Sequence, residues 1–213
     1  MQMNRRQIIK SYASLGLLTT FSLPSFSYSK TQSDLSTSEC LDFIKLYDQF
    51  FIDAKGFDMA LHTNASLSVF VVFDPQCPDC IHFWKIANSF SNKVRFIWLP
   101  VAVLNSRSEL QGALILSASN PADMMARQVI QFETSSRGLI TDGLQVPSSA
   151  RDDVWHNSRI FRRAGGKSVP FALFQDRQNK IRGSAQVGTV EALTKFLNKG
   201  SWPEFMMEKA QYI

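Results

Sequence analysis

The strongest chemical signal in this 213-residue chain is a pair of cysteines, Cys77 and Cys80, separated by Pro78 and Asp79. Two cysteines at this spacing, on the first turn of a helix, can close a small disulfide. Amide N–H groups without partners and the helix dipole stabilise a thiolate at the helix N-terminus. A thiolate is the attacking species in thiol–disulfide exchange. The motif therefore predicts that Cys77 attacks a substrate sulfur and that Cys80 resolves the mixed disulfide.

The two residues between the cysteines are expected to tune this chemistry. Pro78 suits the first helical position, because the N–H that proline lacks would have no intrahelical partner there. Asp79 brings a negative charge close to Cys77, and like charges oppose ionisation. We therefore expect the pKa of Cys77 to be higher than in the same motif with a neutral residue at position 79.

A cysteine pair at this spacing also occurs in zinc sites, which is the first alternative. A structural zinc site needs four ligands, usually from a second such pair, and the sequence has no second pair. The histidines, His62, His82 and His156, are scattered. His82 follows Cys80 closely enough to join a copper site, but an ordinary surface position on the helix is the simpler interpretation. We predict no metal and no cofactor.

The N-terminus has the order of a secretory signal peptide, predicted over residues 1–29. A short basic start is followed by an apolar stretch at 12–23, by Pro24 and by small polar residues. This stretch is shorter than the ~20 residues of a membrane span. The run from Asn4 to Lys10 resembles a twin-arginine signal, with a Sec signal or an uncleaved anchor as alternatives. Export to an oxidising compartment, with no stable anchor after cleavage, is the prediction.

The third cysteine, Cys40, leaves an odd count once Cys77 and Cys80 pair. Ser36 and Glu39 fit a capping box, which predicts a helix from there to about Phe51 with Cys40 on its apolar face. The simpler interpretation of Cys40 is a small buried apolar residue. The alternative is a resolving or intermolecular thiol.

The remaining elements place the cysteine pair inside one βαβ unit. An apolar run at 67–73 predicts a central strand buried on both faces, the helix of the cysteine pair follows to about Ser91, and a second apolar run at 94–101 predicts the next strand. Helices are then expected from Ser108 to Ser119, from Pro121 to Glu133 and from about 148 to 164. A hairpin with strands at 171–174 and 181–185 and a last helix capped by Thr189 complete the order.

The segment from Val69 to Trp84 resembles the active-site strand and helix of DsbG and DsbC, a family of periplasmic disulfide-exchange proteins. Asp74-Pro75 before the first cysteine and Phe83-Trp84 after the second are closer to DsbG. Further similar motifs are the helix ending at Asn120-Pro121, Val169-Pro170 before a strand, and Val187-Gly188 before the last helix. The resemblance extends over residues 66–199.

The resemblance implies an α/β thioredoxin fold for residues 66–200, with a helical insertion between the βαβ unit and the C-terminal β-hairpin and helix. A short helix and linker at 30–65 would precede it, and a tail at 201–213 would follow. It also implies disulfide exchange in the periplasm. DsbC is an isomerase, DsbG protects single cysteines by reducing sulfenic acids, and both are kept reduced by the membrane electron donor DsbD.

The resemblance further implies that Pro170 is a cis proline facing the cysteine pair, and that Val169 and Pro170 bind an extended substrate. Without it, a trans proline opening a strand would be expected. DsbG and DsbC carry threonine at the position of Val169, and valine there is closer to DsbA. This difference leaves the substrate preference open.

Two further properties concern partners. DsbG and DsbC have an N-terminal dimerisation domain, whereas only about 35 to 40 residues separate the predicted cleavage site from the strand at 67–73. We therefore expect a monomer, or a dimer that forms through another surface. The net charge is +5, and Arg5, Arg6 and Lys10 contribute three of the basic residues. Since no clustered basic stripe remains, nucleic acid is not an expected partner.

Three functions remain open at this point. The first is a reductase or isomerase of exported proteins that carry cysteine thiols, disulfides or sulfenic acids, coupled to a DsbD-like membrane donor. The second is a DsbA-like thiol oxidase that uses the same cysteines. The third is a non-catalytic thioredoxin-fold accessory of an envelope assembly, in which the cysteines form only a structural disulfide.

Overall fold

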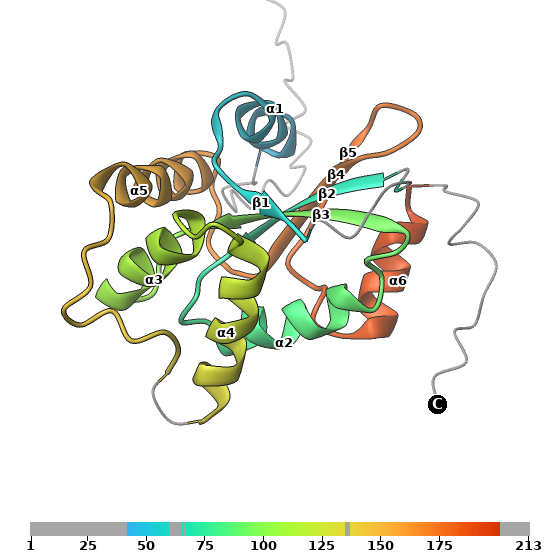
Figure 1. The fold of residues 1–213 in the computed structure, drawn as a ribbon. Helices are drawn as coiled ribbons and strands as arrows, with labels where there is room; N and C mark the ends of the chain where they lie inside the picture. Colours follow the sequence, from blue (N-terminus) through green and yellow to red (C-terminus); the bar gives the residue numbers. More distant parts are fainter. Residues whose placement is uncertain (1–41, 60–64, 66, 135–136, 201–213) are drawn as a thin grey trace, which may run out of the picture. The chain divides into compact units, whose positions relative to one another are not determined.

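The computed structural model describes residues 42–59, 65, 67–134 and 137–200 (Figure 1). The predicted signal peptide at 1–29, Ser36, Cys40 and the tail at 201–213 lie outside this part of the chain. The elements of the described residues are α1 (Phe43–Asp53), β1 (Phe57–Asp58), β2 (Leu67–Phe73), α2 (Pro78–Asn88), β3 (Val94–Pro100), α3 (Ser106–Leu116), α4 (Pro121–Thr134), α5 (Ser148–Arg163), β4 (Phe171–Gln175), β5 (Ile181–Ser184) and α6 (Val190–Asn198).

The strands form one sheet in the order β1-β3-β2-β4-β5. Strands β2 and β3 are parallel, and α2 is the crossover between them, which confirms the predicted βαβ unit. Strand β4 runs antiparallel to β2, and β5 forms the predicted hairpin with β4. Strand β2 is the central strand of the sheet, with β3 on one side and β4 on the other. The chain leaves β2 at Phe73, and α2 begins a few residues later, at Pro78.

Strand β2 is buried on both faces, as its continuous apolar run predicts. Val69, Val71 and Phe73 pack into the core shared with α2 and α6. Phe70 and Val72 pack on the opposite face, with residues of α1 and α5. Figure 1 shows the same division, with α1 and α5 on one side of the sheet and α2 and α6 on the other.

An aromatic cluster anchors α2 to the sheet. Phe83 is fully buried and its ring meets that of Phe96 edge to face at 6.3 Å between centroids. The rings of Trp84 and Trp98 are closer, at 4.7 Å. Aromatic pairs in these geometries add to the free energy gained by burial alone. The helix that carries the cysteine pair therefore rests on a rigid base.

Helices α3, α4 and α5 form the predicted insertion between β3 and β4. The prediction that Ser108 caps α3 is wrong by one turn. Asn105 is the N-cap, and Ser108 sits at the third helical position, where its Oγ accepts a hydrogen bond from the Asn105 N–H. The helix thus has a capping box that begins three residues earlier than expected. Helix α4 begins at Pro121 as predicted.

The first described helix also begins later than expected. Asp42 is extended and its Oδ1 accepts from the Lys45 N–H at 3.0 Å, so that α1 starts at Phe43 and the predicted helix does not run unbroken through Asp42. The part predicted at 36–41 lies outside the described residues. The Asp42 N–H donates instead to the Ala164 carbonyl at 3.0 Å. Strand β1, which pairs antiparallel with β3, was not predicted, because two residues carry no periodic pattern.

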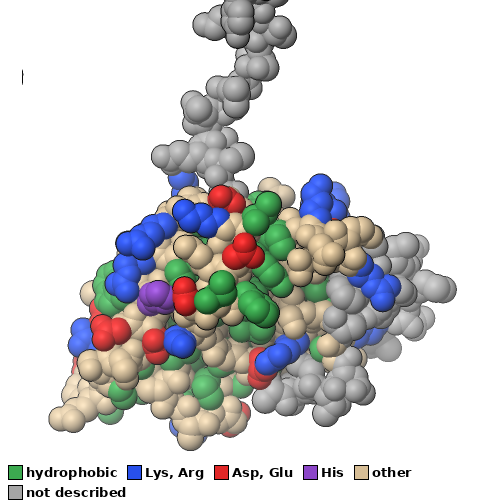
Figure 2. Space-filling model, turned by 90° about the horizontal axis from the view of Figure 1, so that it is seen from above, with side chains coloured by type: hydrophobic (Ala, Val, Ile, Leu, Met, Phe, Trp, Pro, Cys, Tyr) green, Lys and Arg blue, Asp and Glu red, His purple; other side chains and the backbone are tan. Residues whose placement is uncertain are grey.

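The exposed side of α1 carries three large apolar side chains next to Lys45, Asp48 and Asp53. Ile44, Phe51 and Ile52 are 66%, 73% and 74% exposed. Figure 2, which looks onto this side of the molecule, shows hydrophobic side chains gathered among charged ones. No helix of the described residues is long and apolar enough to cross a membrane.

Candidate active site at the start of helix α2

Cys77 is the N-cap residue of α2, and Pro78 occupies the first turn as predicted. The Cys77 Sγ accepts a hydrogen bond from the Cys80 N–H at 3.4 Å. The Cys77 N–H donates to the Asp74 carbonyl at 3.0 Å, which closes the turn between β2 and α2. A sulfur in the N-cap position therefore takes the place of the oxygen that caps most helices.

The two cysteines differ in burial and in pKa. Cys77 is 6% exposed, and Cys80 is completely buried. The pKa of Cys77 is lowered, first by a hydrogen bond from the Cys80 side chain and further by the backbone N–H groups of Cys80 and Asp79, while partial burial opposes this. The pKa of Cys80 is raised well above its usual value, mainly by burial and then by the interactions with Cys77. Cys77 is thus the residue that ionises first.

Asp79 acts on the pKa of Cys77 in two opposite ways. Its backbone N–H helps to lower that pKa, whereas the charge of its exposed side chain raises it. The charge is the smaller contribution, which is expected where solvent screens it. The sign of the side-chain effect agrees with the expectation from the sequence.

The Val169–Pro170 peptide bond is cis, which confirms that prediction. The Cys77 Sγ lies 3.5 Å from the Val169 carbonyl oxygen and donates to it in the thiol form. A loop 92 residues further along the chain therefore lies directly against the first cysteine. This carbonyl is a backbone acceptor directly beside the sulfur.

Asp74 fixes the loop that leads from β2 to Cys77, and the sequence analysis did not identify it as a site residue. Its carboxylate is fully buried and accepts from the N–H groups of Gln76 at 2.8 Å, Val103 at 2.9 Å and Leu104 at 3.0 Å. It therefore ties the loop before Cys77 to the loop after β3. Asp-Pro marks the end of a strand in the sequence, and no local pattern indicates these distant partners.

Comparison with known proteins adds sequence and fold similarity. No family model matches the chain. It is 27% identical over 125 residues to the thiol:disulfide interchange protein DsbG of Escherichia coli K12, which covers 56% of this chain and 48% of that protein. It is 20% identical over 122 residues to DsbG of Pseudomonas aeruginosa, covering 56% and 46%. The matched region thus spans about half the length of these relatives.

Solved structures agree with this similarity. A linker-deleted Proteus mirabilis ScsC superposes with a TM-score of 0.57 at 14% identity, covering 76% of this chain and 82% of that one. DsbG of Helicobacter pylori superposes with a TM-score of 0.50 at 19% identity, covering 62% and 61%. DsbA2 of Pseudomonas aeruginosa gives 0.51 at 14% identity, covering 73% and 98%. This chain is a DsbG-like protein with the thioredoxin fold.

The described residues around the site show no cluster of metal-binding side chains. Among the described residues, no three or more histidine, cysteine, aspartate or glutamate side chains are close enough to share an ion. His82 is exposed on α2, and His62 lies outside the described residues. The pair Cys77 and Cys80 is present as two free thiols.

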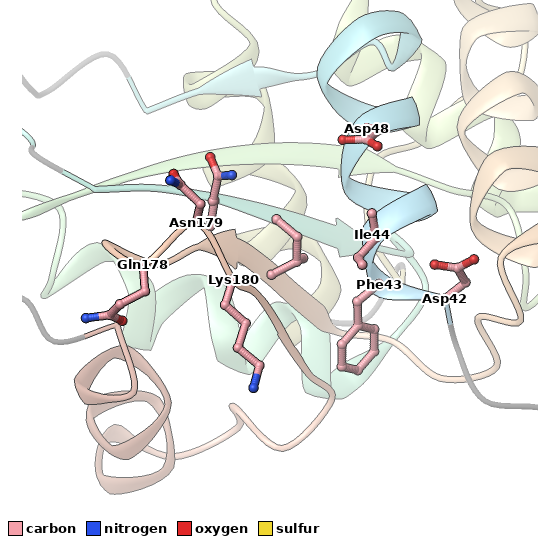
Figure 3. Close-up of a pocket in the computed structure, with 9 residues that line it drawn as sticks. Asp42, Phe43, Ile44, Asp48, Gln178, Asn179 and Lys180 are labelled. Atoms are coloured by element: carbon pink, nitrogen blue, oxygen red, sulfur yellow. The ribbon is translucent and has the colours of Figure 1, made fainter.

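A separate pocket of about 650 Å³ opens between α1 and the β4–β5 turn (Figure 3). Its lining residues include Asp42, Phe43, Ile44, Asp48 and Lys180. Neither cysteine and neither residue of the cis peptide bond lines it. The pocket is therefore separate from the cysteine pair at the start of α2.

Proposed function

We propose that this chain is an exported, periplasmic thiol:disulfide oxidoreductase that reduces or isomerises bonds at the cysteines of other exported proteins. One observation carries the proposal. The Cys77 Sγ caps α2, its pKa is lowered, and it lies against the Val169 carbonyl, while Cys80 is fully buried behind it. This is the arrangement of an attacking thiolate with a resolving partner.

In the first step, the Cys77 thiolate attacks one sulfur of a substrate disulfide. A bond forms between Cys77 Sγ and that sulfur, the substrate S–S bond breaks, and the other substrate sulfur leaves as a thiolate that takes a proton from water. With a sulfenic acid as substrate, the S–O bond breaks instead, and the oxygen leaves as hydroxide, which takes up a proton and becomes water. An extended substrate segment beside Val169 would place its sulfur within reach of Cys77.

In the second step, Cys80 attacks the Cys77 Sγ and releases the reduced substrate. Cys80 must first lose its proton, and its pKa is raised by burial and by the interactions with Cys77. Once Cys77 is in a mixed disulfide, its negative charge is gone, so that contribution to the raised pKa disappears. Two electrons pass to the substrate, and Cys77 and Cys80 are left as a disulfide.

Turnover as a reductase then requires a dithiol donor that returns two electrons to this disulfide. A DsbD-like membrane protein is the proposed donor, and the substrates are proteins with exposed thiols, disulfides or sulfenic acids. The chain is proposed to act as a monomer, without nucleic acid or a metal. Sedimentation of the mature protein tests the oligomeric state, and a tight dimer would contradict it.

Oxidation of thiols is the second candidate, and Val169 is the observation that favours it. Valine before the cis proline differs from the threonine of DsbG and DsbC and is closer to DsbA. The two directions differ in the resting state of the cysteines. Alkylation of thiols in intact cells would find Cys77 and Cys80 reduced for a reductase or isomerase, and oxidised for an oxidase.

The decisive experiment is capture of substrates with Cys80→Ala. Without the resolving thiol, we expect exported proteins to remain bound to Cys77 through disulfides that a reductant releases. The control is Cys80→Ala combined with Cys77→Ser, which should capture none. Full function of a Cys77→Ser, Cys80→Ser protein in the cell would instead support the non-catalytic accessory and would overturn the proposal.

A further inference from the structure

We propose that three buried glutamines, Gln76, Gln111 and Gln128, form a positioning cluster that holds Cys77 in its N-cap geometry by tying the active-site loop to the helical insertion. We call them the glutamine cluster. This inference rests on the proposed function, because it concerns the nucleophile of that reaction. The three residues come from the loop before α2, from α3 and from α4.

The side chains of the glutamine cluster bond to one another. The Gln111 Oε1 accepts from the Gln76 Nε2 at 2.7 Å and from the Gln128 Nε2 at 3.1 Å. The exposed fractions are 8% for Gln76, 1% for Gln111 and 0% for Gln128. Buried amides are costly unless they are satisfied, and a fully satisfied network is rigid. Gln111 is therefore the centre of a rigid polar contact within the core.

The glutamine cluster also forms hydrogen bonds with the two residues directly before Cys77. The Gln128 Nε2 donates to the Pro75 carbonyl at 2.6 Å. The Gln76 side chain bonds to Gln111 and to the Arg137 carbonyl, while its own N–H donates to Asp74. Both residues that precede the nucleophile are thus fixed by α3 and α4, elements that the thioredoxin βαβ unit itself does not contain.

The glutamine cluster is also hydrogen-bonded to the loop that follows α4. The Leu139 N–H donates to the Gln128 Oε1 at 2.7 Å, and the Gln111 Nε2 donates to the Leu139 carbonyl at 2.9 Å. Gly138 lies between these contacts with φ of +101°, and a Cβ there would come within 2.2 Å of the Gln128 Nε2. Only glycine combines this backbone conformation with this close approach.

The consequence for Cys77 follows from its capping role. The Cys80 N–H and the first-turn amides stabilise the thiolate only while the preceding backbone points the sulfur at them. If Pro75 and Gln76 are released, the sulfur loses part of this contact and its pKa rises. The ionisable groups that act on Cys77, namely Cys80 and Asp79, are unchanged by substitutions in the cluster.

The test compares two glycines of the same loop. Gly138→Ala forces the Gln128 side chain out of place without removing a polar group. Gly143→Ala is the matched control, since Gly143 also has positive φ, +75°, but a Cβ there would meet nothing within 4 Å. Both substitutions strain the backbone. The readout is the pKa of Cys77, from the rate of alkylation against pH in a Cys40→Ser background.

We expect Gly138→Ala to raise this midpoint by about one pH unit, the order of one weakened hydrogen bond to a charged group, and Gly143→Ala to leave it unchanged. Gln111→Met should raise it as well. Asn157→Leu is the second control, because that buried amide bonds to Lys55 and Pro100 and not to the active-site loop. It should lower the melting temperature alone.

The proposal is overturned if Gly138→Ala and Gln111→Met lower the melting temperature but leave the midpoint of Cys77 unchanged, or if both controls raise it equally. Should those variants fail to fold, Gln76→Met is the replacement test, because Gln76 belongs to the active-site loop. It should also raise the midpoint of Cys77. Failure of the proposed function looks different. In that case the unmodified protein shows no exchange and an ordinary pKa at Cys77, whatever the cluster variants do.

Discussion

The Cys80 N–H lies 3.4 Å from the Cys77 Sγ, so the second cysteine of the pair stabilises a thiolate at the first through its own backbone. The Cys80 side chain adds a hydrogen bond to the same sulfur, and this is the largest contribution to the lowered pKa of Cys77. The backbone and side-chain contributions of Cys80 can be separated, because substitution removes only the second.

Cys80→Ala is expected to raise the pKa of Cys77 by about one pH unit, since the side-chain donor is lost while the N–H remains. Cys80→Ser keeps a hydroxyl donor and should raise the pKa less. The rate of alkylation of Cys77 against pH measures both. Equal pKa values in Cys80→Ala and the unmodified protein would show that the Cys80 thiol does not donate to Cys77.

Asp79→Asn is expected to lower the pKa of Cys77 by a few tenths of a pH unit, because the exposed carboxylate opposes thiolate formation and solvent screens it. The backbone N–H of residue 79 is kept, so only the charge changes. The rate of alkylation of Cys77 against pH measures this change as well, and Asp79→Glu is the control that retains the charge. An unchanged or higher pKa in Asp79→Asn would contradict the expectation.

Local patterns in the sequence predicted most of the fold. The apolar run at β2, the cysteine pair with Pro78, the Asn-Pro start of α4 and the Thr189 cap all depend on neighbours in the chain, and all are found. The start of α3 was predicted wrongly. Ser108 is a good cap by type, but Asn105 holds the N-cap position, and its side chain also donates to Gln76, 29 residues away, a contact that no local pattern indicates.

The surroundings of the site were less predictable. Cys77 and Cys80 follow from spacing, whereas Asp74 and the glutamine cluster carry no motif. Their roles depend on contacts between residues far apart in the chain, such as Gln128 with the Pro75 carbonyl, 53 residues away. Glutamine is common on exposed helix faces, so nothing in the sequence separates these three from the rest.

Phe83→Ala is expected to reduce the free energy of unfolding by about 3–5 kcal/mol, the usual cost of removing a fully buried aromatic ring. The ring packs against Phe96 and Trp98 beneath α2. His82→Ala, an exposed neighbour on the same helix, is the control and should change it by less than about 0.5 kcal/mol. Urea denaturation measures both, and a small effect of Phe83→Ala would mean that α2 is not anchored by this cluster.

Asp176→Asn tests the ion pair between the buried Asp176, in the β4–β5 turn, and the partly exposed Arg182 of β5. Burial raises the pKa of Asp176, but hydrogen bonds from the Lys180 and Gln178 N–H groups and the Arg182 guanidinium outweigh it and lower the pKa overall. A lowered carboxyl pKa stabilises the fold above the unfolded value of about 3.9, and this contribution is lost as the pH falls through the folded pKa. The unmodified protein should therefore lose stability below about pH 4.

Asp176→Asn should lower the free energy of unfolding near neutral pH by about 1–2 kcal/mol, since Arg182 loses its charged acceptor. The difference between the two proteins should then shrink on acidification, because Asp176 becomes protonated in the unmodified chain as well. Urea denaturation at neutral and acidic pH measures it, with Asp142→Asn at an exposed turn position as the control. A difference that stays constant with pH would show that the ionised carboxylate contributes nothing and that only the shape of the side chain matters.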